Sequence, residues 1–244
     1  MMRRLEVVRP MARRLVDWIN AQLKRALPGY CAFCHTAVAG GSPWCAECFA
    51  DMPWNRSACA LCAEPLPMLS SASSAPRQCG RCLKHPPAQQ AAWVPLRYES
   101  RVARLIQRYK FSADARAGEV LVQLMLATLS RSPDVGEAVI GVPGHRERTR
   151  ERGFDHTAWL TKRLAARLKM PVIVAERRRE TPSQRGLDRR SRRRNVKGAF
   201  TVAQPLPPAV MIVDDVMTTG ATLESLAIAC REAGAQRAHQ PLPA

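Results

Sequence analysis

Apolar residues follow two different patterns along the part of the chain that begins at residue 91. Short apolar runs bounded by turn residues predict buried strands, and apolar residues that recur every three or four positions predict helices. The runs predict strands at 93–98, 138–142, 172–175 and 210–213. The periodic stretches predict helices at 102–109, 118–129 and 155–168, with a further helix after Gly220. Strands that alternate with helices predict an α/β domain over 91–244, built on a mostly parallel sheet flanked by helices.

Two other segments precede this domain. Residues 1–29 are predicted to hold an amphipathic helix over 5–27, because apolar side chains recur on one face until Pro28-Gly29 ends the pattern. We expect this helix to pack on the rest of the chain, and a basic helix on a membrane surface is the alternative. Residues 30–84 form a cysteine-rich segment.

Eight of the nine cysteines form four C-x-x-C pairs. Two such pairs can supply the four thiolates of a tetrahedral Zn²⁺ site, so four pairs predict two zinc ions. The spacings between pairs suit short ribbon hairpins and favour pairing in sequence order, although a cross-braced arrangement stays open. An all-thiolate site leaves no open coordination position, so the zinc is expected to be structural. The predicted ligands are Cys31, Cys34, Cys45 and Cys48 for one ion, and Cys59, Cys62, Cys79 and Cys82 for the other.

Disulfide bonds and a redox-active pair are the alternatives to zinc. The chain has no apolar run long enough to span a membrane and no signal-peptide pattern, so it is expected to be cytoplasmic, where thiols stay reduced. A redox pair normally occurs once beside a βαβ unit, not in four copies. The ninth cysteine, Cys230, lies on the apolar face of the last predicted helix and is expected in the core.

The chain carries a large excess of positive charge. Its 38 Lys and Arg residues against 20 Asp and Glu give a net charge of +18, which favours anionic partners such as phosphates, nucleic acid or an acidic membrane surface. Two basic segments, 143–154 and 177–197, directly follow predicted strands. Ligands of parallel sheets bind at the carboxyl ends of strands, so both segments are expected to be loops that form a polyanion site. A solvated basic loop is the alternative for the second segment.

Residues 210–223, VMIVDDVMTTGATL, hold the most specific motif of the chain. An apolar run predicts a buried strand, Asp214 and Asp215 follow at its end, and a turn rich in hydroxyl groups leads into a helix. The N–H groups and the dipole at a helix start favour an anion, and paired carboxylates suit sugar hydroxyls or a divalent metal. The motif therefore predicts a pocket for a phosphorylated sugar, and the alternative is an ordinary strand followed by a capped helix.

This motif resembles the signature of type I phosphoribosyltransferases, which bind phosphoribosyl pyrophosphate (PRPP). The resemblance implies that Asp214 and Asp215 are catalytic residues that contact the ribose hydroxyls, and that the turn wraps the 5′-phosphate. It also implies that Mg²⁺ bridges the diphosphate and ribose hydroxyls of PRPP. The turn residues expected to bind PRPP are Met217, Thr218, Thr219, Gly220, Ala221 and Thr222.

The whole chain resembles the ComF/GntX family, in which a double zinc ribbon precedes a type I phosphoribosyltransferase-like domain. The resemblance covers the cysteine pairs, RYKFSADARAG (108–118), VPGHRERTRERGFDH (142–156), TPSQRGLDRRSRRRNVKGAF (181–200) and the PRPP motif. It implies that arginines of the first basic segment, and a Q…R..N pattern in a flexible loop, contact the diphosphate of PRPP. These further PRPP-binding candidates are Arg146, Arg148, Arg152, Gln184, Arg192 and Asn195.

The chain departs from the family pattern at two places. Asp155-His156 stands where the family often has Asn-Gln, a change expected to be tolerated. After Gly234 the family usually continues into an apolar strand, whereas this chain reads AQRAHQPLPA, which is polar and interrupted by proline. That strand is therefore expected to be missing or badly formed, and the sheet to be incomplete.

Two classes of function follow from these features. The resemblance implies a glycosyltransferase-class enzyme that transfers phosphoribosyl from PRPP, or from another phosphorylated ribose, to an acceptor that the sequence does not identify. It also implies a link with DNA uptake in natural transformation. The alternative is a non-catalytic competence protein that binds single-stranded DNA or docks a helicase-like partner through the zinc module. The net charge favours this alternative, whereas the aromatic content of 5% argues mildly against base stacking.

Overall fold

In the computed structural model the chain forms two compact units, one that ends at Met52 and one that begins at Pro53. The structure describes residues 29–39, 41–68, 76–129, 136–179 and 189–241. The amphipathic helix predicted at 5–27 lies outside these residues. No helix within the described residues is long and apolar enough to cross a membrane. The module boundaries predicted from the sequence, 30–84 and 91–244, stay predictions.

The first unit holds the first two cysteine pairs in a small ribbon. Strands β1 (Gly29–Tyr30) and β2 (Ala37–Val38) pair antiparallel, and the turn between them carries the first pair. The second pair begins helix α2 (Ala46–Ala50), where the Cys45 sulfur caps the helix by accepting a hydrogen bond from the Cys48 N–H at 3.4 Å. A tight turn and a helix start thus present two sulfurs each.

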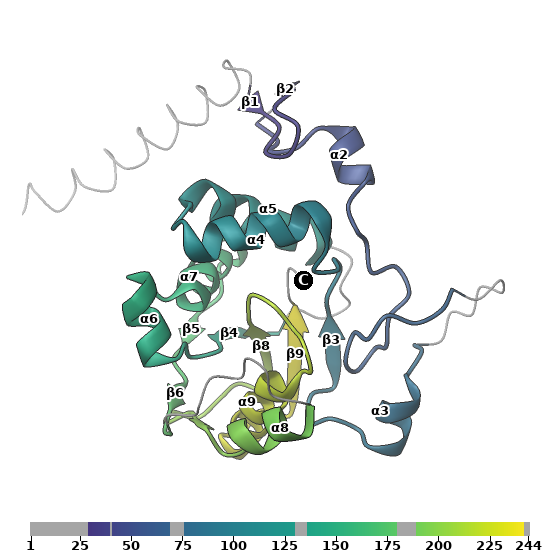
Figure 1. The fold of residues 1–244 in the computed structure, drawn as a ribbon. Helices are drawn as coiled ribbons and strands as arrows, with labels where there is room; N and C mark the ends of the chain where they lie inside the picture. Colours follow the sequence, from purple (N-terminus) through teal and green to yellow (C-terminus); the bar gives the residue numbers. More distant parts are fainter. Residues whose placement is uncertain (1–28, 40, 69–75, 130–135, 180–188, 242–244) are drawn as a thin grey trace, which may run out of the picture. The chain divides into compact units, whose positions relative to one another are not determined.

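The second unit is built on a five-stranded parallel sheet (Figure 1). Neighbouring strands are parallel throughout, and every residue of the central strand β8 is buried. The α/β architecture predicted from the sequence is therefore confirmed. The strands lie in the order β3 (Ala91–Trp93), β9 (Arg237–Pro241), β8 (Ala209–Val213), β4 (Ala138–Gly141) and β5 (Val172–Ile173).

Helices cover both faces of this sheet (Figure 1). Successive strand residues point to opposite faces, and β8 shows this alternation directly. Met211 and Val213 pack with residues of α5 and α7, whereas Val210 and Ile212 pack with residues of α9. Helix α4 packs on α5, and α8 packs on α9. The bounds are α4 (Ser100–Phe111), α5 (Ala115–Leu129), α7 (His156–Leu168), α8 (Arg189–Val196) and α9 (Ala221–Glu232).

The C-terminal strand β9 corrects one expectation. The polar segment after Gly234 was expected to lack a good strand, yet it forms β9 and pairs with β8 on one side and β3 on the other. The main chain explains this result, because a strand between two parallel neighbours gains backbone hydrogen bonds whatever its side chains. At the centre, Ala238 is fully buried and its N–H donates to the Gln90 side chain at 2.8 Å. A small residue and a polar partner replace the expected apolar run.

The first basic segment corrects a second expectation, since it is not a loop. Residues Arg146–Arg152 form helix α6, which begins after His145 and ends at Gly153. Arg and Glu are good helix formers, and this favours a helical turn wherever the chain has room. Gly153 ends the helix with a φ of 78°, a left-handed conformation that favours glycine.

The second basic segment lies between two short strands. Strands β6 (Glu176–Arg177) and β7 (Phe200–Thr201) pair antiparallel. Residues 180–188 lie outside the described part of the chain, and helix α8 follows them. The basic run expected as one loop thus contains a helix, and this helix packs on α9.

The last two cysteine pairs belong to the same compact unit as the sheet. Helix α3 (Gly80–Lys84) begins directly after Cys79, the first cysteine of the final pair, and contains the second, Cys82. The Ala92 N–H in β3 donates to the Ala60 carbonyl at 2.9 Å, and the Gln89 side chain donates to the Leu61 carbonyl at 3.0 Å. Hydrogen bonds of this kind join the second ribbon directly to the first strand of the sheet.

Candidate functional site

The eight paired cysteines form two groups of four, in sequence order. Within each group the sulfur atoms lie within 4.8 Å of one another. The Sγ atoms of Cys34 and Cys45 are 3.7 Å apart, as are those of Cys62 and Cys79. Tetrahedral zinc with Zn–S bonds of about 2.3 Å places its sulfur ligands about 3.8 Å apart. The two groups therefore fit two structural zinc sites, with the pairing that the spacing favoured.

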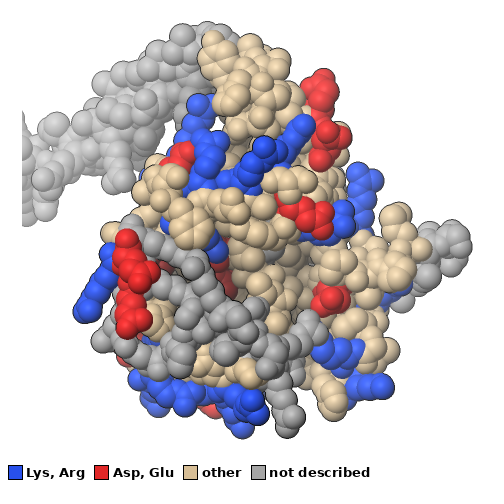
Figure 2. Space-filling view, in the orientation of Figure 1, with Lys and Arg blue, Asp and Glu red and all other residues tan. Residues whose placement is uncertain are grey.

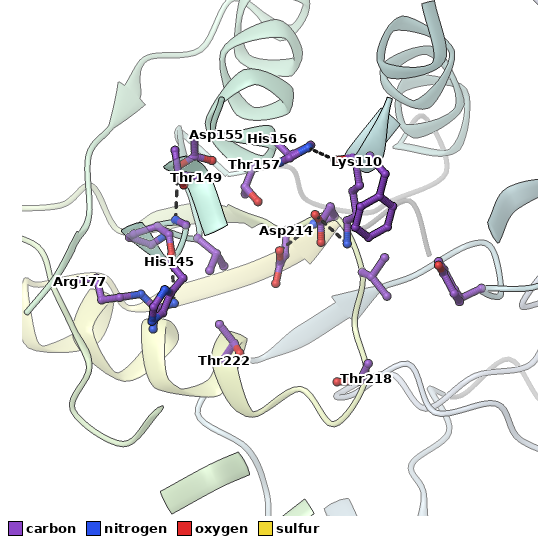
Figure 3. Close-up of a pocket in the computed structure, with 17 residues that line it drawn as sticks. Lys110, His145, Thr149, Asp155, His156, Thr157, Arg177, Asp214, Thr218 and Thr222 are labelled. Atoms are coloured by element: carbon purple, nitrogen blue, oxygen red, sulfur yellow. Dashed lines mark hydrogen bonds and ion pairs between the residues drawn. The ribbon is translucent and has the colours of Figure 1, made fainter. Parts of the chain in front are cut away.

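A cavity of about 390 Å³ opens beyond the carboxyl ends of β4 and β8, in the second unit (Figure 3). Its lining comes from the end of α4, the β4–α6 connection, the start of α7, Arg177 in β6 and the segment between β8 and α9. Parallel sheets commonly bind ligands at this position, because loops from several strands converge there. The cavity is the candidate site.

Asp214 and Asp215 directly follow strand β8 and line this cavity, and Figure 3 labels Asp214 at its floor. The Asp215 Oδ2 atom lies 2.9 Å from Lys110 Nζ, and the two side chains are only 14% and 17% exposed. The backbone N–H of Asp215 donates to Asp214 Oδ1 at 2.8 Å. Burial raises the pKa of the Asp214 carboxyl well above its usual range, and the charge of Asp215 raises it further. The pair thus combines an acid in contact with a lysine and an acid whose pKa is raised above its usual range.

The turn between β8 and α9 forms another wall. Thr218 and Thr222 line the cavity, and Gly220 precedes the helix with a φ of 72°. This left-handed conformation suits glycine, because other residues adopt it at a cost. The Thr219 hydroxyl accepts a hydrogen bond from the Ala221 N–H at 3.4 Å, which caps the helix start. Hydroxyl groups and a helix N-terminus facing one cavity favour an anionic group there.

The opposite wall brings the β4–α6 connection close to the start of α7. Asp155 caps α7 by accepting from the Ala158 N–H at 2.9 Å, and its other oxygen accepts from the Gly144 N–H at 3.4 Å. A Cβ atom at position 144 would lie 2.8 Å from that oxygen and 2.9 Å from the Thr149 hydroxyl. Only glycine allows this close approach, so Gly144 fixes where the backbone passes the cavity.

A second cationic side chain reaches the cavity from β6. Arg177 donates to the Pro143 carbonyl at 3.2 Å, and its guanidinium carbon lies 4.8 Å from the centre of the Phe200 ring. These contacts hold the guanidinium beside the cavity, where it adds positive potential to this wall.

The predicted site residues fall into three groups. Asp214, Asp215, Thr218 and Thr222 line the cavity. The other residues of the turn shape it: Thr219 caps α9, Gly220 supplies the left-handed turn, Ala221 is buried and Met217 packs against the core. The remaining candidates lie on the two basic segments and are Arg146, Arg148, Arg152, Gln184, Arg192 and Asn195.

These remaining candidates are only partly described. The three arginines belong to α6, whose first turn borders the cavity through Thr149, but their side chains lie outside the described part of the structure, as does all of Gln184. Arg192 and Asn195 belong to α8, where the Asn195 carbonyl accepts from Arg179 at 3.1 Å. Their roles toward PRPP stay predictions.

Several residues of the cavity were missed by reasoning from the sequence, most importantly Lys110. It lies within the segment 108–118 that carried part of the family resemblance, so a signal was present. Its contact with Asp215 joins residues that are far apart in the chain, and no periodicity or spacing predicts such a contact. Tyr98, His145 and Thr149 line the cavity as well.

The donor set at the floor of the cavity fits Mg²⁺. This ion prefers oxygen ligands, and proteins commonly bind it through one or two carboxylates while substrate phosphates and water complete its shell. Asp214 and Asp215 supply the carboxylates, and the hydroxyls of Thr218 and Thr222 line the same cavity. The site therefore suits a magnesium ion that enters with a phosphorylated ligand.

Comparison with known proteins relates the chain to two curated proteins. It is 31% identical over 211 residues to the DNA utilization protein YhgH of Escherichia coli O157:H7, covering 82% of this chain and 90% of that protein. It is 29% identical over 228 residues to competence protein F of Haemophilus influenzae, covering 89% of this chain and 90% of that protein. Residues 22–83 match the model of the double zinc ribbon domain family.

Solved structures give more distant matches. Orotate phosphoribosyltransferase from Aeropyrum pernix aligns with a TM-score of 0.36 and 22% identity, covering 53% of this chain and 61% of that one. Adenine phosphoribosyltransferase from Leishmania tarentolae aligns with a TM-score of 0.36 and 12% identity, covering 60% and 89%. The identity to YhgH extends across most of both chains, and the double zinc ribbon occupies the N-terminal part. This chain belongs to the ComF/GntX family, together with YhgH and competence protein F.

Proposed function

We propose that the protein binds PRPP, or another phosphorylated ribose, together with Mg²⁺. One observation carries this proposal: a single cavity at the carboxyl ends of β4 and β8 gathers the acid pair, the hydroxyl-rich turn and the N-terminus of α9. These groups match the two ends of a ribose 5-phosphate. Carboxylates accept hydrogen bonds from sugar hydroxyls, and helix N–H groups bind phosphate oxygens.

Each part of the ligand then has an expected partner. The ribose hydroxyls would contact Asp214 and Asp215, and the 5′-phosphate would lie in the turn from Met217 to Thr222. The diphosphate would face the wall to which Thr149 of α6 and Arg177 contribute. The arginine-rich α8 and the segment before it are candidates to fold over the diphosphate.

The reaction proposed for this site is displacement at the ribose C1 atom, with diphosphate as the leaving group. Positive charge develops on the ribose ring as the bond to the leaving group breaks. The carboxylates at the cavity floor would stabilise this charge, and arginines on the opposite side would stabilise the departing diphosphate. Bound Mg²⁺ would supply further charge stabilisation for the diphosphate. We leave the acceptor open and assign the site to the glycosyltransferase class.

DNA uptake in natural transformation is the biological role that we propose for this chemistry. Family membership supports it, because competence protein F and the DNA utilization protein YhgH are relatives across most of the chain. The same names support a second candidate, a non-catalytic protein that binds single-stranded DNA or docks a helicase-like partner.

An exposed basic surface favours the second candidate. Arg178, Arg179, Arg194 and Lys197 are exposed around β6 and α8, and Figure 2 shows Lys and Arg side chains gathered along the lower edge of the face in view. Such a surface binds nucleic acid through phosphate contacts, without reading its sequence. Binding of PRPP and binding of DNA can therefore coexist in one molecule.

Calorimetric titration separates these functions. Wild-type protein is titrated with PRPP in the presence of Mg²⁺ and, in parallel, with a single-stranded oligonucleotide over a series of salt concentrations. We expect saturable binding of PRPP. The affinity for PRPP should depend less on salt concentration than the affinity for the oligonucleotide. Affinity for DNA that rests on phosphate contacts falls steeply as salt rises.

Each outcome has a definite meaning. Binding of PRPP supports the phosphorylated-ribose site, whether or not the oligonucleotide also binds. A protein that binds the oligonucleotide with a steep salt dependence but shows no PRPP binding contradicts the enzyme proposal and leaves the nucleic-acid candidate.

A further inference from the structure

Lys110 is the cation nearest the acid pair among the described residues that line the cavity. It lies near the C-terminal end of α4, and its Nζ atom is 2.9 Å from Asp215 Oδ2 (Figure 3). Both side chains are more than four-fifths buried, so water screens this ion pair less than it screens a surface pair. A charged lysine held in a cavity that is proposed to bind an anionic sugar needs a function there.

The backbone of Lys110 is fixed by a pair of hydrogen bonds between α4 and α7. The His156 Nε2–H group donates to the Lys110 carbonyl at 2.8 Å. The Tyr109 hydroxyl donates in turn to the His156 carbonyl at 2.7 Å. Tyr109 is almost fully buried, and its ring meets that of His156 edge to face at 5.2 Å.

These contacts hold the end of one helix against the start of another, and they hold the lysine over the acids. Rotation of the Lys110 backbone would break the hydrogen bond to His156. The position of the Nζ atom therefore depends on Tyr109 and His156 as well as on Asp215.

We propose that Lys110 is a positioning residue for ribose binding: it balances the charge of Asp215 and fixes the orientation of its carboxylate, and Tyr109 and His156 hold Lys110 in place. This inference rests on the proposed PRPP site and assigns a role within it. Two adjacent carboxylates of like charge repel each other in a partly buried site. The lysine offsets that repulsion, so that the acids can face the ribose hydroxyls together.

The proposed role predicts which part of a ligand depends on Lys110. A residue that acts through Asp215 affects binding of the ribose, whereas a residue that contacts the diphosphate affects binding of the diphosphate itself. Three ligands separate these roles in calorimetric titrations: PRPP with Mg²⁺, ribose 5-phosphate, and inorganic diphosphate with Mg²⁺.

Lys110→Met is expected to weaken binding of PRPP and of ribose 5-phosphate by about tenfold or more, the scale expected when one member of a buried charge pair is removed. Binding of inorganic diphosphate is expected to change by less than about threefold. Lys110→Arg keeps the charge and is expected to recover most of the lost affinity. Lys162→Met, which removes an exposed lysine on α7, is the matched control and is expected to match the wild type.

Tyr109→Phe provides a second variant that changes no charge. It removes the hydroxyl that donates to the His156 carbonyl and keeps the buried ring. This variant is also expected to bind PRPP and ribose 5-phosphate more weakly than the wild type, by a smaller factor than Lys110→Met. Its binding of inorganic diphosphate is expected to stay nearly unchanged. This variant carries the test if thermal unfolding shows that Lys110→Met is not folded.

The outcomes distinguish this inference from the function on which it rests. A wild-type protein that binds none of the three ligands contradicts the PRPP site itself. Lys110→Met and Tyr109→Phe proteins that bind all three ligands as the wild type does contradict only the positioning role. Equal losses for all three ligands, inorganic diphosphate included, contradict it as well.

Discussion

Asp214 and Asp215 are neighbours in the chain, but they lie in different electrostatic surroundings. Asp215 forms an ion pair with Lys110, whose Nζ atom lies 2.9 Å from its Oδ2 atom. Asp214 is subject to burial and to the charge of Asp215, both of which favour its protonated form. The sequence assigns both acids the same contact with the ribose hydroxyls, whereas the fold pairs Asp215 with Lys110 and raises the pKa of Asp214.

The raised pKa of Asp214 makes the stability of the protein depend on pH. A raised pKa in the folded state means that folding favours the protonated acid, so this contribution to stability is complete below about pH 4 and is lost as pH rises through the folded pKa. Asp214→Asn stays neutral at every pH. We expect its Tm to exceed that of the wild type by a margin that grows between pH 5 and pH 9. Each kcal/mol of difference in the free energy of unfolding should raise the margin by about 2–4 °C.

Differential scanning calorimetry at several pH values measures this margin. Glu232→Gln, which neutralises an exposed acid at the end of α9, is the control and is expected to show no such trend. A margin that stays constant or shrinks as pH rises contradicts the raised pKa of Asp214.

At the residue scale the sequence predicted what is local and missed what is distant. Asp214, Asp215, Thr218 and Thr222 occupy one short motif, and all four line the cavity, while their roles toward PRPP stay predictions. Lys110 lies about a hundred residues away in the chain, and its side chain reaches Asp215 only because α4 ends beside β8. Neither the composition of the chain nor the spacing of its motifs predicts the contact between Lys110 and Asp215.

At the scale of elements, backbone pairing outweighed the side-chain pattern in one strand. The apolar strands β4 and β8 were predicted within one residue of their observed ends. Strand β9 was not predicted, because its sequence is polar and contains proline. It is stabilised by pairing with a strand on each side, β8 and β3. Helix α6 was missed for a related reason, since periodicity cannot identify a helix without an apolar face.

Strand β9 should be essential to the sheet, and Ala238 tests this. Its side chain is fully buried in the core between the sheet and α9. Ala238→Asp would bury a charge without a partner and is expected to lower the free energy of unfolding by about 3 kcal/mol or more. Gln236→Ala, an exposed change two residues earlier, is the control and is expected to be neutral. Chemical denaturation compares the two, and an Ala238→Asp protein as stable as the control contradicts a buried β9.

At the scale of the whole molecule, the two cysteine groups belong to different compact units. The first group lies in the unit that ends at Met52, and the second group lies in the unit that holds the sheet. The sequence places all eight cysteines in one run, so their spacing suggests a single module. Hydrogen bonds from Ala92 and Gln89 to the second ribbon decide its association with β3.

This division predicts unequal effects of removing zinc from each group. Cys59→Ser with Cys62→Ser is expected to lower the Tm of the sheet-containing unit and to weaken PRPP binding. Cys31→Ser with Cys34→Ser is expected to leave both nearly unchanged, because these residues lie in the other unit. Metal analysis should give about two zinc ions per wild-type chain and about one in each variant.

Thermal unfolding, titration and metal analysis of the same preparations test this account. Equal losses of stability in the two double variants contradict the assignment of the second ribbon to the sheet-containing unit. A wild-type protein with well under two zinc ions per chain contradicts the paired zinc sites.

Asp214 and Asp215, with the turn that follows them, are proposed to form a PRPP site. Calorimetric titration of PRPP with Mg²⁺ into the double variant Asp214→Ala plus Asp215→Ala tests it most directly, with Glu232→Ala as the control. The account predicts that the wild type and the control bind PRPP with the same affinity, whereas the folded double variant shows no measurable binding. A folded double variant that binds PRPP as tightly as the wild type would contradict the claim.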